Sequence, residues 1–328
     1  MESAANSLRR LAACNVLVMG DAMLDRYWFG EVDRISPEAP VPVVAVGASE
    51  ERIGGAGNVA CNIAALGGSC TLLSVVGADE AGRRFSDIAA RAGVDAKLVA
   101  DADGQTTVKL RVISRNQQLL RADFESAPGA DALAEANEQF DALLDGHQAA
   151  VLSDYGKGAL REVERLIAAA ARKNIPVLID PKGDDFARYR GAAMVTPNLK
   201  EFERVAGAVA DDDDLRAKAE ALMQQHSLER VLVTLSDRGM ALFARGREPL
   251  RREARAREVY DVSGAGDSVI AVMAMATAAG LDHDDALALA NSAAGVVVSK
   301  LGTATASAQE LEAALARDYG DRGGGGAR

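Results

Sequence analysis

The pattern of apolar positions along the chain indicates strands and helices in regular alternation. A continuous apolar run from Asn15 to Gly20 is typical of a strand buried on both faces of a parallel sheet. From residue 132 onward, runs with helical periodicity alternate with short apolar runs. We expect helices over 132–144, 160–173 and 213–226, and strands over 149–152, 177–179, 193–195 and 230–235. This alternation predicts an α/β fold with a doubly wound, mostly parallel sheet and helices on both faces.

The remaining segments extend the same pattern toward both ends of the chain. Further helices are expected over 59–66, 80–92, 267–279, 286–300 and 308–316, and a further strand over 71–76. Residues 1–13 are interpreted as an N-terminal tail, either frayed or a short helix, and the glycine-rich residues 319–328 as a disordered tail. A single domain over residues 14–318 follows.

Two segments whose sequences do not follow the strand–helix alternation predict a small β-flap that acts as a lid over the site. Residues 26–46 contain three prolines and the only tryptophan, Trp28, and proline favours edge strands. Residues 104–124 alternate like exposed strands around a turn near Arg115 and Asn116. Exposed strands are usually paired or covered, so we also expect the flap to join two copies of the chain as a homodimer.

Composition excludes several classes of partner. The chain has 328 residues, is 48% hydrophobic and carries a net charge of −11, so binding to nucleic acid or to an anionic membrane is not expected. It has no apolar run long enough to span a membrane and no signal-like start, which favours a cytoplasmic protein. The three cysteines and three histidines follow no known site spacing, which disfavours a zinc site, a disulfide and histidine-based catalysis.

The stretch DVSGAGD, residues 261–267, is the strongest single indication of chemistry. Gly264 and Gly266 leave backbone N–H groups uncovered where an apolar helix begins, and such a turn can bind an anion. Asp267 would stand beside that anion, where like charges repel. It is therefore better explained as a base that removes a proton from a hydroxyl attacking a phosphate. Taken alone, the stretch is explained about equally well as an ordinary helix start with two turn glycines.

Polar motifs follow most of the expected strands, at the sheet edge where open α/β sheets bind ligands. Asp21 and Asp25 follow the first strand, and the loop GGAGN, which contains Gly55 and Asn58, precedes a helix. Glycines there allow close approach to a ligand, and an amide such as Asn58 suits hydroxyl groups. Later strands end in SDYGKG (153–158), DPKG (180–183), TPNLKE (196–201) and TLSDRG (234–239). Together these endings predict a long cleft of the kind that a two-substrate enzyme needs.

The order and spacing of GGAGN, TPNLKE, VTLSDRG and DVSGAGD resemble the ribokinase-type carbohydrate kinase family over about residues 14–318. Longer stretches resemble the branch of that family that phosphorylates heptose 7-phosphate at its anomeric hydroxyl, for ADP-heptose and lipopolysaccharide synthesis. These stretches are GDAMLDRYWFGEVDRISPEAPVPVV, LSDYGKG and IDPKGDDFARYRGA. In many bacteria this kinase is fused to a nucleotidyltransferase, and the absence of an HxGH pair here implies the kinase alone.

The resemblance implies roles for the residues nearest the reaction. Asp267 would be the base, and the migrating phosphoryl group would be held by Gly264, Ala265 and Gly266. Sugar hydroxyls would be bound in the loop and strand that contain Asp25, Gly55 and Asn58.

It also implies ATP and Mg²⁺, and possible use of a monovalent cation. Asn198 and Glu201 would act on magnesium and phosphate through water. The nucleotide site would include Lys182, Thr234, Ser236, Gly239 and Asn291, and the cation loop would include Asp261, Ser263, Lys300 and Gly302. Lys300 is unusual in that loop and makes retention of the cation doubtful.

Basic residues at positions expected to face the cleft indicate a substrate that is itself a sugar phosphate. Lys109 and Arg111 are two apart on an expected strand and so share one face, and Lys157 lies in SDYGKG. Lys182 in DPKG suits either the sugar phosphate or the ATP phosphates. For the flap pair, ordinary solvent-facing charges are an equally good explanation.

Other functions remain open at this point. A non-catalytic sugar or nucleotide sensor would not need a base beside an anion site, and a nicotinamide dehydrogenase is disfavoured because GDAMLD replaces GxGxxG. Fructose-phosphate and nucleoside kinases are the nearest alternatives among kinases. Ribose is disfavoured because GGAGN is one residue shorter than the ribokinase motif GGKGAN, with Ala56 in place of Lys, and because Met23 replaces an Asn.

Overall fold

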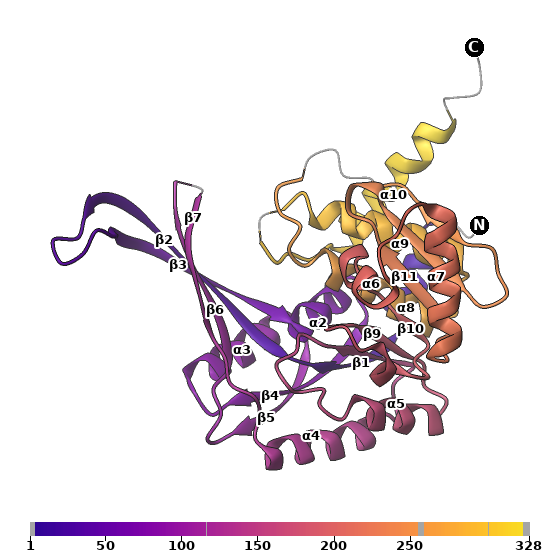
Figure 1. The fold of residues 1–328 in the computed structure, drawn as a ribbon, viewed down its shortest axis with the longest axis horizontal. Helices are drawn as coiled ribbons and strands as arrows, with labels where there is room; N and C mark the ends of the chain where they lie inside the picture. Colours follow the sequence, from indigo (N-terminus) through magenta and orange to yellow (C-terminus); the bar gives the residue numbers. More distant parts are fainter. Residues whose placement is uncertain (1–3, 116, 255–258, 301, 324–328) are drawn as a thin grey trace.

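The computed structural model describes residues 4–115, 117–254, 259–300 and 302–323, which form a large α/β body and a projecting small sheet (Figure 1). The body contains a nine-stranded sheet in the order β13-β12-β11-β10-β9-β8-β1-β4-β5. The strands from β11 to β5 pair in parallel, while β12 and β13 are antiparallel. The bounds are β1 Asn15–Gly20, β4 Ser69–Gly77, β5 Asp95–Asp101, β8 Ala149–Ser153, β9 Val177–Asp180, β10 Met194–Val195, β11 Arg230–Thr234, β12 Met240–Ala244 and β13 Leu250–Arg252. The expected doubly wound, mostly parallel sheet is confirmed.

Alternation along β1 divides the hydrophobic core into two layers. Val16 and Val18 belong to the core on one face of the sheet, and Leu17 and Met19 to the core on the other. A strand covered on both faces is apolar at every position, which explains why NVLVMG shows no polar alternation.

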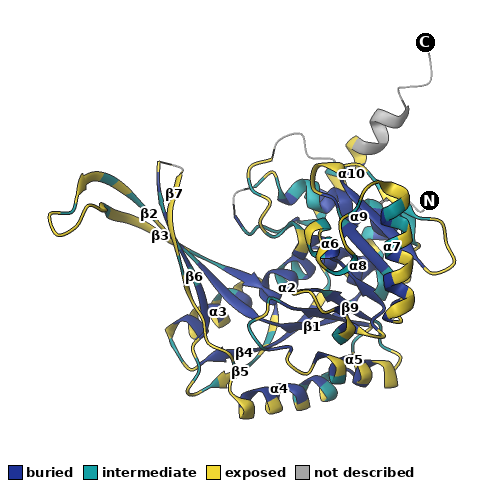
Figure 2. Cartoon of the chain, in the orientation of Figure 1, coloured by how far each residue is buried: buried dark blue, intermediate teal, exposed yellow. Residues whose placement is uncertain are grey.

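Helices cover both faces of the sheet (Figures 1 and 2). The first face carries α1 Ala4–Ala12, α2 Ala56–Ala65, α3 Glu80–Arg91, α8 Ala265–Ala278, α9 His283–Val297 and α10 Ala308–Gly323. The second face carries α4 Ala130–Leu143, α5 Val163–Arg172, α6 Leu199–Ala206 and α7 Asp212–Gln225. The most apolar of these helices, α8, runs through the first layer and is buried along most of its length.

The second sheet has the order β3-β2-β6-β7 and forms the expected small flap. Its strands are β2 Ala22–Ile35, β3 Pro42–Gly55, β6 Thr107–Ser114 and β7 Gln117–Phe124, and we refer to residues 22–55 and 107–124 as the lid. Near the body, Leu24 and Val108 pack against Ala81 of α3, whereas the far end of the lid is exposed (Figure 2). The strands extend beyond the expected segment 26–46 at both ends, so Asp25 and Gly55 belong to the lid.

The two ends of the chain compare differently with the expected tails. Residues 4–12 form helix α1, the short helix that was one of the two expectations for this segment, and its Leu11 is fully buried in the first core layer. Helix α10 continues to Gly323 because the preceding sequence is rich in Ala, Glu, Leu and Arg, which favour helix. The expected disordered tail is therefore wrong for residues 319–323, and residues 324–328 lie outside the described residues.

Candidate active site

The turn before α8, which was expected to bind an anion, has the glycine backbone that the sequence indicated. Gly264 adopts a left-handed backbone with φ of 80°, and no side chain caps the helix that follows it. A Cβ atom at Gly264 would lie 2.7 Å from the amide nitrogen of Asn58, so only glycine fits. Because the first N–H groups of a helix have no partner within it, the exposed turn at Gly266 can offer them to an anion.

Asp267 lies in the first turn of α8 and is only 4% exposed. The Asn58 amide donates a hydrogen bond to its Oδ2 at 2.6 Å, and the hydroxyl of Tyr155 donates to its Oδ1. Burial raises the pKa of Asp267 above its ordinary value, while the hydrogen bonds from Tyr155 and Asn58 act in the opposite direction. The result is a fixed, buried carboxylate beside the anion-binding turn.

Asn58 is fixed by the helix that carries it. Helix α2 begins at Ala56, earlier than expected, because Gly55 adopts a positive φ of 61° in a space where a Cβ would lie 2.3 Å from the Asp21 carbonyl oxygen. Asn58 therefore lies in the first turn of α2 rather than in a loop. Asn62, one turn later, accepts a hydrogen bond from Ser268 of α8 at 2.7 Å, which ties the two helices together.

The lid brings Asp25 to the same site. Asp25 is 4% exposed and receives a hydrogen bond from Arg111 Nη1 at 2.5 Å. Arg111 also lies over the ring of Tyr27, with its guanidinium carbon 5.2 Å from the ring centroid, and Arg52 does the same. The expected pair on one strand face, Lys109 and Arg111, lies opposite Asp25 and Tyr27 in the β2–β6 register.

Lys109 differs from the other basic residues of the site. Among the described residues its ammonium group makes no ion pair, whereas Arg111 binds Asp25 and Lys157 binds Glu125 at 2.6 Å. Burial lowers the pKa of Lys109, and the charge of Asp25 acts in the opposite direction. The lid thus carries one partly buried cation, Lys109, that forms no ion pair with a carboxylate among the described residues.

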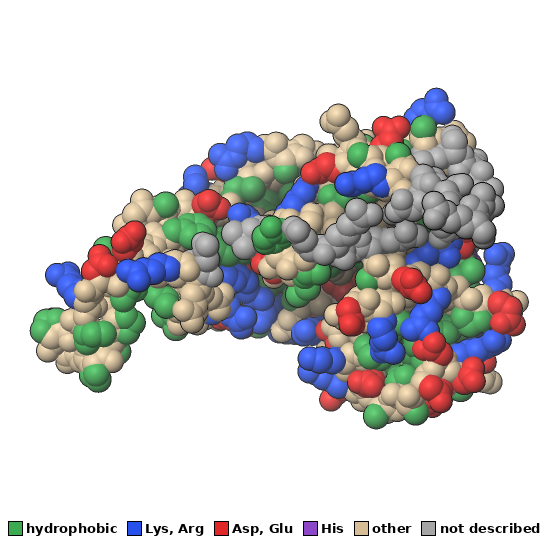
Figure 3. All heavy atoms as spheres, turned by 90° about the horizontal axis from the view of Figure 1, so that it is seen from above, with side chains coloured by type: hydrophobic (Ala, Val, Ile, Leu, Met, Phe, Trp, Pro, Cys, Tyr) green, Lys and Arg blue, Asp and Glu red, His purple; other side chains and the backbone are tan. Residues whose placement is uncertain are grey.

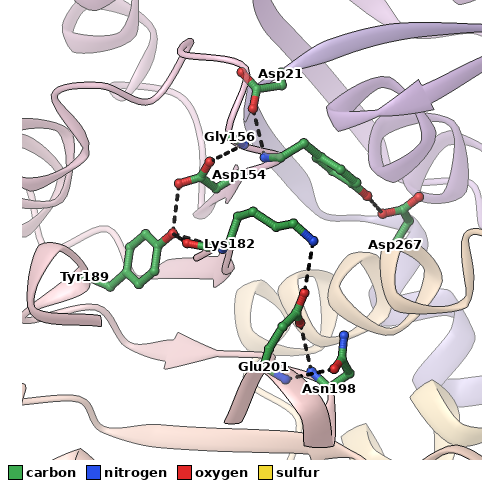
Figure 4. A network of polar contacts seen from close by, with 9 residues as sticks. Asp21, Asp154, Gly156, Lys182, Tyr189, Asn198, Glu201 and Asp267 are labelled. Carbon is green, nitrogen blue, oxygen red and sulfur yellow. Dashed lines mark hydrogen bonds and ion pairs between the residues drawn. The ribbon is translucent and has the colours of Figure 1, made fainter. Parts of the chain in front are cut away.

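Asn198 and Glu201 form a reciprocal cap at the start of α6. The Asn198 side chain accepts from the Glu201 N–H at 3.0 Å, and Glu201 Oε2 accepts from the Asn198 N–H at 3.1 Å. This capping box explains the spacing of the NxxE element structurally. The second carboxylate oxygen of Glu201 accepts a hydrogen bond from Lys182 Nζ at 3.3 Å, so the side chains of Lys182 and Glu201 point toward one another (Figure 4).

The residues expected at the nucleotide lie farther along the same sheet edge. Thr234 ends β11 and bridges to Asn198, and Ser236 and Gly239 form the positive-φ turn that leads into β12. Asn291 is buried in α9, where its amide donates to the Glu253 carbonyl at 2.8 Å. The Asn291 side chain therefore fixes the backbone at Glu253, the residue that follows β13.

Residues 14–310 match the pfkB family carbohydrate kinases. The chain belongs to this family. It is 53% identical over 303 residues to the D-beta-D-heptose 7-phosphate kinase of Bordetella bronchiseptica, with 92% of this chain and 96% of that one covered. It is 54% identical over 318 residues to the bifunctional protein HldE of Pseudomonas paraeruginosa, and spans 97% of its own length and 67% of that protein.

Solved structures of pfkB-type and ribokinase-type enzymes share the fold. Phosphofructokinase-2 from Escherichia coli, in complex with potassium, gives a TM-score of 0.78 at 22% identity, covering 93% of this chain and 98% of that one. Ribokinase from Arabidopsis thaliana, with ribose and ATP, gives 0.74 at 19% identity, covering 92% and 99%. The ribokinase-like fold of this pfkB family kinase is thereby established.

Sequence reasoning missed Tyr155, the second side chain bound to Asp267. The motif SDYGKG drew attention only to Lys157, although a tyrosine in a strand-end loop can be recognised as a candidate hydrogen-bond donor. It also passed over Asp180, at the end of β9, whose pKa is raised by burial and by the negative charges of Asp267 and Glu201. Asp180 therefore adds a further carboxyl group close to Asp267 and Glu201 in this kinase.

The expected cation loop of this pfkB family kinase is held together by Asp261. Its carboxylate accepts from the Ser263 N–H at 2.9 Å and from the Gly302 N–H at 3.0 Å. Lys300 turns away from this carboxylate, since its ammonium binds Glu310 and the Thr305 carbonyl at 2.7 Å.

Metal-binding clusters of side chains and membrane-spanning helices are both absent from the described residues. They contain no cluster of three or more His, Cys, Asp or Glu side chains that could hold a metal ion directly. No helix among them is long and apolar enough to cross a membrane.

Proposed function

We propose that this pfkB family kinase transfers the γ-phosphoryl group of ATP to the anomeric hydroxyl of D-glycero-β-D-manno-heptose 7-phosphate. The product is the 1,7-bisphosphate, an intermediate of ADP-heptose and lipopolysaccharide synthesis in the cytoplasm. The observation that carries this proposal is the 53% identity, over nearly the whole of both chains, to an enzyme named D-beta-D-heptose 7-phosphate kinase. The buried Asp267 and the lid cation Lys109 are the groups such a reaction requires.

In the proposed reaction, Asp267 accepts the proton of the anomeric hydroxyl as that oxygen attacks the γ-phosphorus of ATP. The bond from the γ-phosphorus to the bridging oxygen breaks, and ADP leaves with the electron pair. The turn Gly264–Gly266 and the positive end of α8 stabilise the charge on the group in transfer. Asp25 and Asn58, with the close backbone approach at Gly55, orient the sugar hydroxyls.

The nucleotide is proposed to lie along the edge formed by the ends of β9, β10 and β11. Lys182 and Asn198 would face its phosphates, and the wall around the rest of ATP would include Thr234, Ser236, Gly239 and Asn291. Mg²⁺ suits this edge because it favours carboxylate oxygens, keeps several waters and binds substrate phosphates. Glu201 would hold it through water, close to the carboxyl group of Asp180. When bound, Mg²⁺ neutralises charge on the phosphates.

A monovalent cation is proposed at the loop tied by Asp261. The carboxylate is partly exposed and accepts the backbone N–H groups of Ser263 and Gly302, together with a hydrogen bond from the Ser263 side chain. The positive charge of Lys300 is already balanced by Glu310 rather than by Asp261. The side-chain charge of Lys300 therefore does not substitute for a cation at this loop.

The remote phosphate of the sugar is proposed to bind the lid face that carries Lys109 and Arg111, with Lys157 at its edge. An unpaired dianion is costly to remove from water, so its site needs a cation that is not already neutralised. Lys109 meets this requirement among the described residues, because it alone of these three lacks an ion pair.

The lid is also proposed to mediate a homodimer. Most of the exposed large hydrophobic side chains among the described residues lie on it, and Figure 3 shows hydrophobic side chains gathered at its tip. They are Trp28, Ile35, Val41, Val46, Leu119, Leu120 and Phe124. A contiguous apolar surface of this kind usually marks an interface.

A coupled assay of ATP consumption tests the function directly. The panel contains heptose 7-phosphate, unphosphorylated heptose, fructose 6-phosphate and ribose, each with Mg²⁺. Heptose 7-phosphate should be by far the best substrate, and phosphorus NMR of the product should show a second phosphate on the anomeric carbon. Equal turnover of the phosphorylated and unphosphorylated heptoses, or preference for fructose 6-phosphate, would refute the proposed substrate.

A further inference from the structure

The side chain that faces Asp267 opposite Asn58 belongs to a loop with its own anchor. The hydroxyl of Tyr155 donates to Asp267 Oδ1, and the loop after β8 that carries it is held by the carboxylate of Asp21 (Figure 4). Asp21 accepts the N–H groups of Tyr155 at 2.8 Å, Lys157 at 2.9 Å and Ala159 at 2.9 Å. A buried carboxylate with three backbone donors fixes the loop, so the position of the tyrosine ring is set independently of Asp267.

The phenol is the donor in this contact. Burial and the neighbouring charge of Asp267 raise the pKa of Tyr155 well above its ordinary value, so the hydroxyl keeps its proton across the range in which enzymes work. With Asn58 on Oδ2 and Tyr155 on Oδ1, each carboxylate oxygen of Asp267 has one fixed donor. The lone pairs that remain are those that can face a sugar hydroxyl.

We propose that Tyr155 is a positioning residue for the phosphoryl transfer: it holds Asp267 as a carboxylate turned toward the attacking hydroxyl. This inference rests on the proposed role of Asp267 as base. It assigns no contact between Tyr155 and the sugar.

The physical reason is the balance of groups around Asp267. Desolvation disfavours its charged form, as do the nearby carboxylates Asp25 from β2 and Asp180 from β9. Lys109 from β6 and the two hydrogen bonds from Tyr155 and Asn58 favour the charged form. A hydrogen bond to a charged group and one pKa unit are similar in free energy. Loss of the Tyr155 hydroxyl should therefore raise the pKa of Asp267 by about one unit.

The competing explanation is that Tyr155 only fills space in the loop. In that case the Tyr155 hydroxyl has no effect on the protonation of Asp267, and removal of the hydroxyl would change turnover by the same factor at every pH. A shift in the pH dependence separates the two explanations, because packing alone does not change which protonation state of Asp267 is active.

The test is the dependence of kcat on pH for Tyr155→Phe. The base must be ionised, so activity is lost as pH falls through the pKa of Asp267. In the variant this acid limb should move upward by about one pH unit, with most of the turnover recovered on the alkaline plateau and KM for both substrates little changed. The matched control is Tyr189→Phe, because Tyr189 also donates to a buried carboxylate, Asp154 Oδ2 at 2.8 Å. Its acid limb should coincide with that of the wild type.

An acid limb at the wild-type position in Tyr155→Phe would overturn the inference. If that variant does not fold, 3-fluorotyrosine placed at position 155 keeps the ring and strengthens the donor, so the limb should move to lower pH; no movement would equally overturn it. Absence of turnover of heptose 7-phosphate by the wild type would instead refute the proposed substrate. The pH series would then be run on the sugar phosphate that the panel identifies, and Tyr155 would be judged on that reaction.

Discussion

The substitution Lys109→Met separates substrate binding from stability at a single lid residue. Methionine is unbranched and flexible like lysine and nearly as long, but it lacks the ammonium group and therefore the charge and its N–H donors. In the structure this ammonium is partly buried, faces Asp25, and makes no ion pair among the described residues. If it binds the remote phosphate of the sugar, the variant loses one charge-assisted hydrogen bond, of about 1.5–3 kcal/mol. That loss corresponds to an increase in KM for heptose 7-phosphate of about 10- to 100-fold.

The same change should make the free enzyme more stable. The pKa of Lys109 is lowered in the folded protein, so folding disfavours its charged form, and removal of the charge relieves that penalty at neutral pH. We therefore expect the melting temperature of the ligand-free variant to rise. An increase in KM together with an increase in melting temperature is the signature of a binding residue rather than of a structural one.

Steady-state kinetics and thermal melting check this prediction together. KM for ATP should stay at the wild-type value, and turnover of unphosphorylated heptose should change little. The control is Lys97→Met, which removes an exposed lysine on β5 that is paired with Asp95 at 2.9 Å, away from the lid. If KM for heptose 7-phosphate in Lys109→Met stays within about twofold of the wild type, Lys109 does not contact the phosphate.

Three further outcomes are expected. Asp267→Asn should lower kcat by about 10²- to 10⁴-fold, while the affinity for ATP measured by calorimetry should stay at the wild-type value. A variant that keeps more than about a tenth of wild-type turnover would show that Asp267 only starts the helix and is not the base. Glu201→Gln keeps the capping box, since Gln serves at that position as Glu does, so the fold should persist while more Mg²⁺ is needed for half-maximal rate. If the Mg²⁺ concentration for half-maximal rate is unchanged in this variant, Glu201 serves only to cap α6 and does not hold the metal. Light scattering at micromolar concentration should give twice the chain mass of 34.2 kDa, and Trp28→Asp should reduce it; a monomeric wild type would remove the lid dimer.

Elements that are regular in sequence were predicted well because local pattern and burial agree in them. The run 16–20 has no polar side chain and lies inside the sheet, between β8 and β4, so nothing in its surroundings opposes its propensity. By contrast, β5 was not predicted, because only Val99 of this edge strand is buried and the sequence DAKLVAD is neither a continuous apolar run nor a strict alternation. Helix α6 was not predicted because its first residues were interpreted mainly as a ligand motif, with a helix start at Glu201 as the less favoured alternative, although NLKE is also a capping box.

The candidate site was predictable where chemistry and backbone requirement coincide. The glycines at 264 and 266 and the carboxylate at 267 occur together because a helix start, an anion and a base need them in that order. Tyr155 was not predictable in the same way. It meets Asp267 across 112 positions of sequence, and only the anchoring of its loop by Asp21 brings the two together.

The single tryptophan of the chain lies three positions along β2 from Asp25, on the opposite face of the strand and 36% exposed. Fluorescence excited at wavelengths that only tryptophan absorbs therefore comes entirely from the lid, with no contribution from the body of the protein. Trp28 lies on the same strand as Asp25, so we expect sugar binding at the proposed site to alter the surroundings of Trp28. The native protein thus carries a built-in optical reporter of its lid and needs no attached dye.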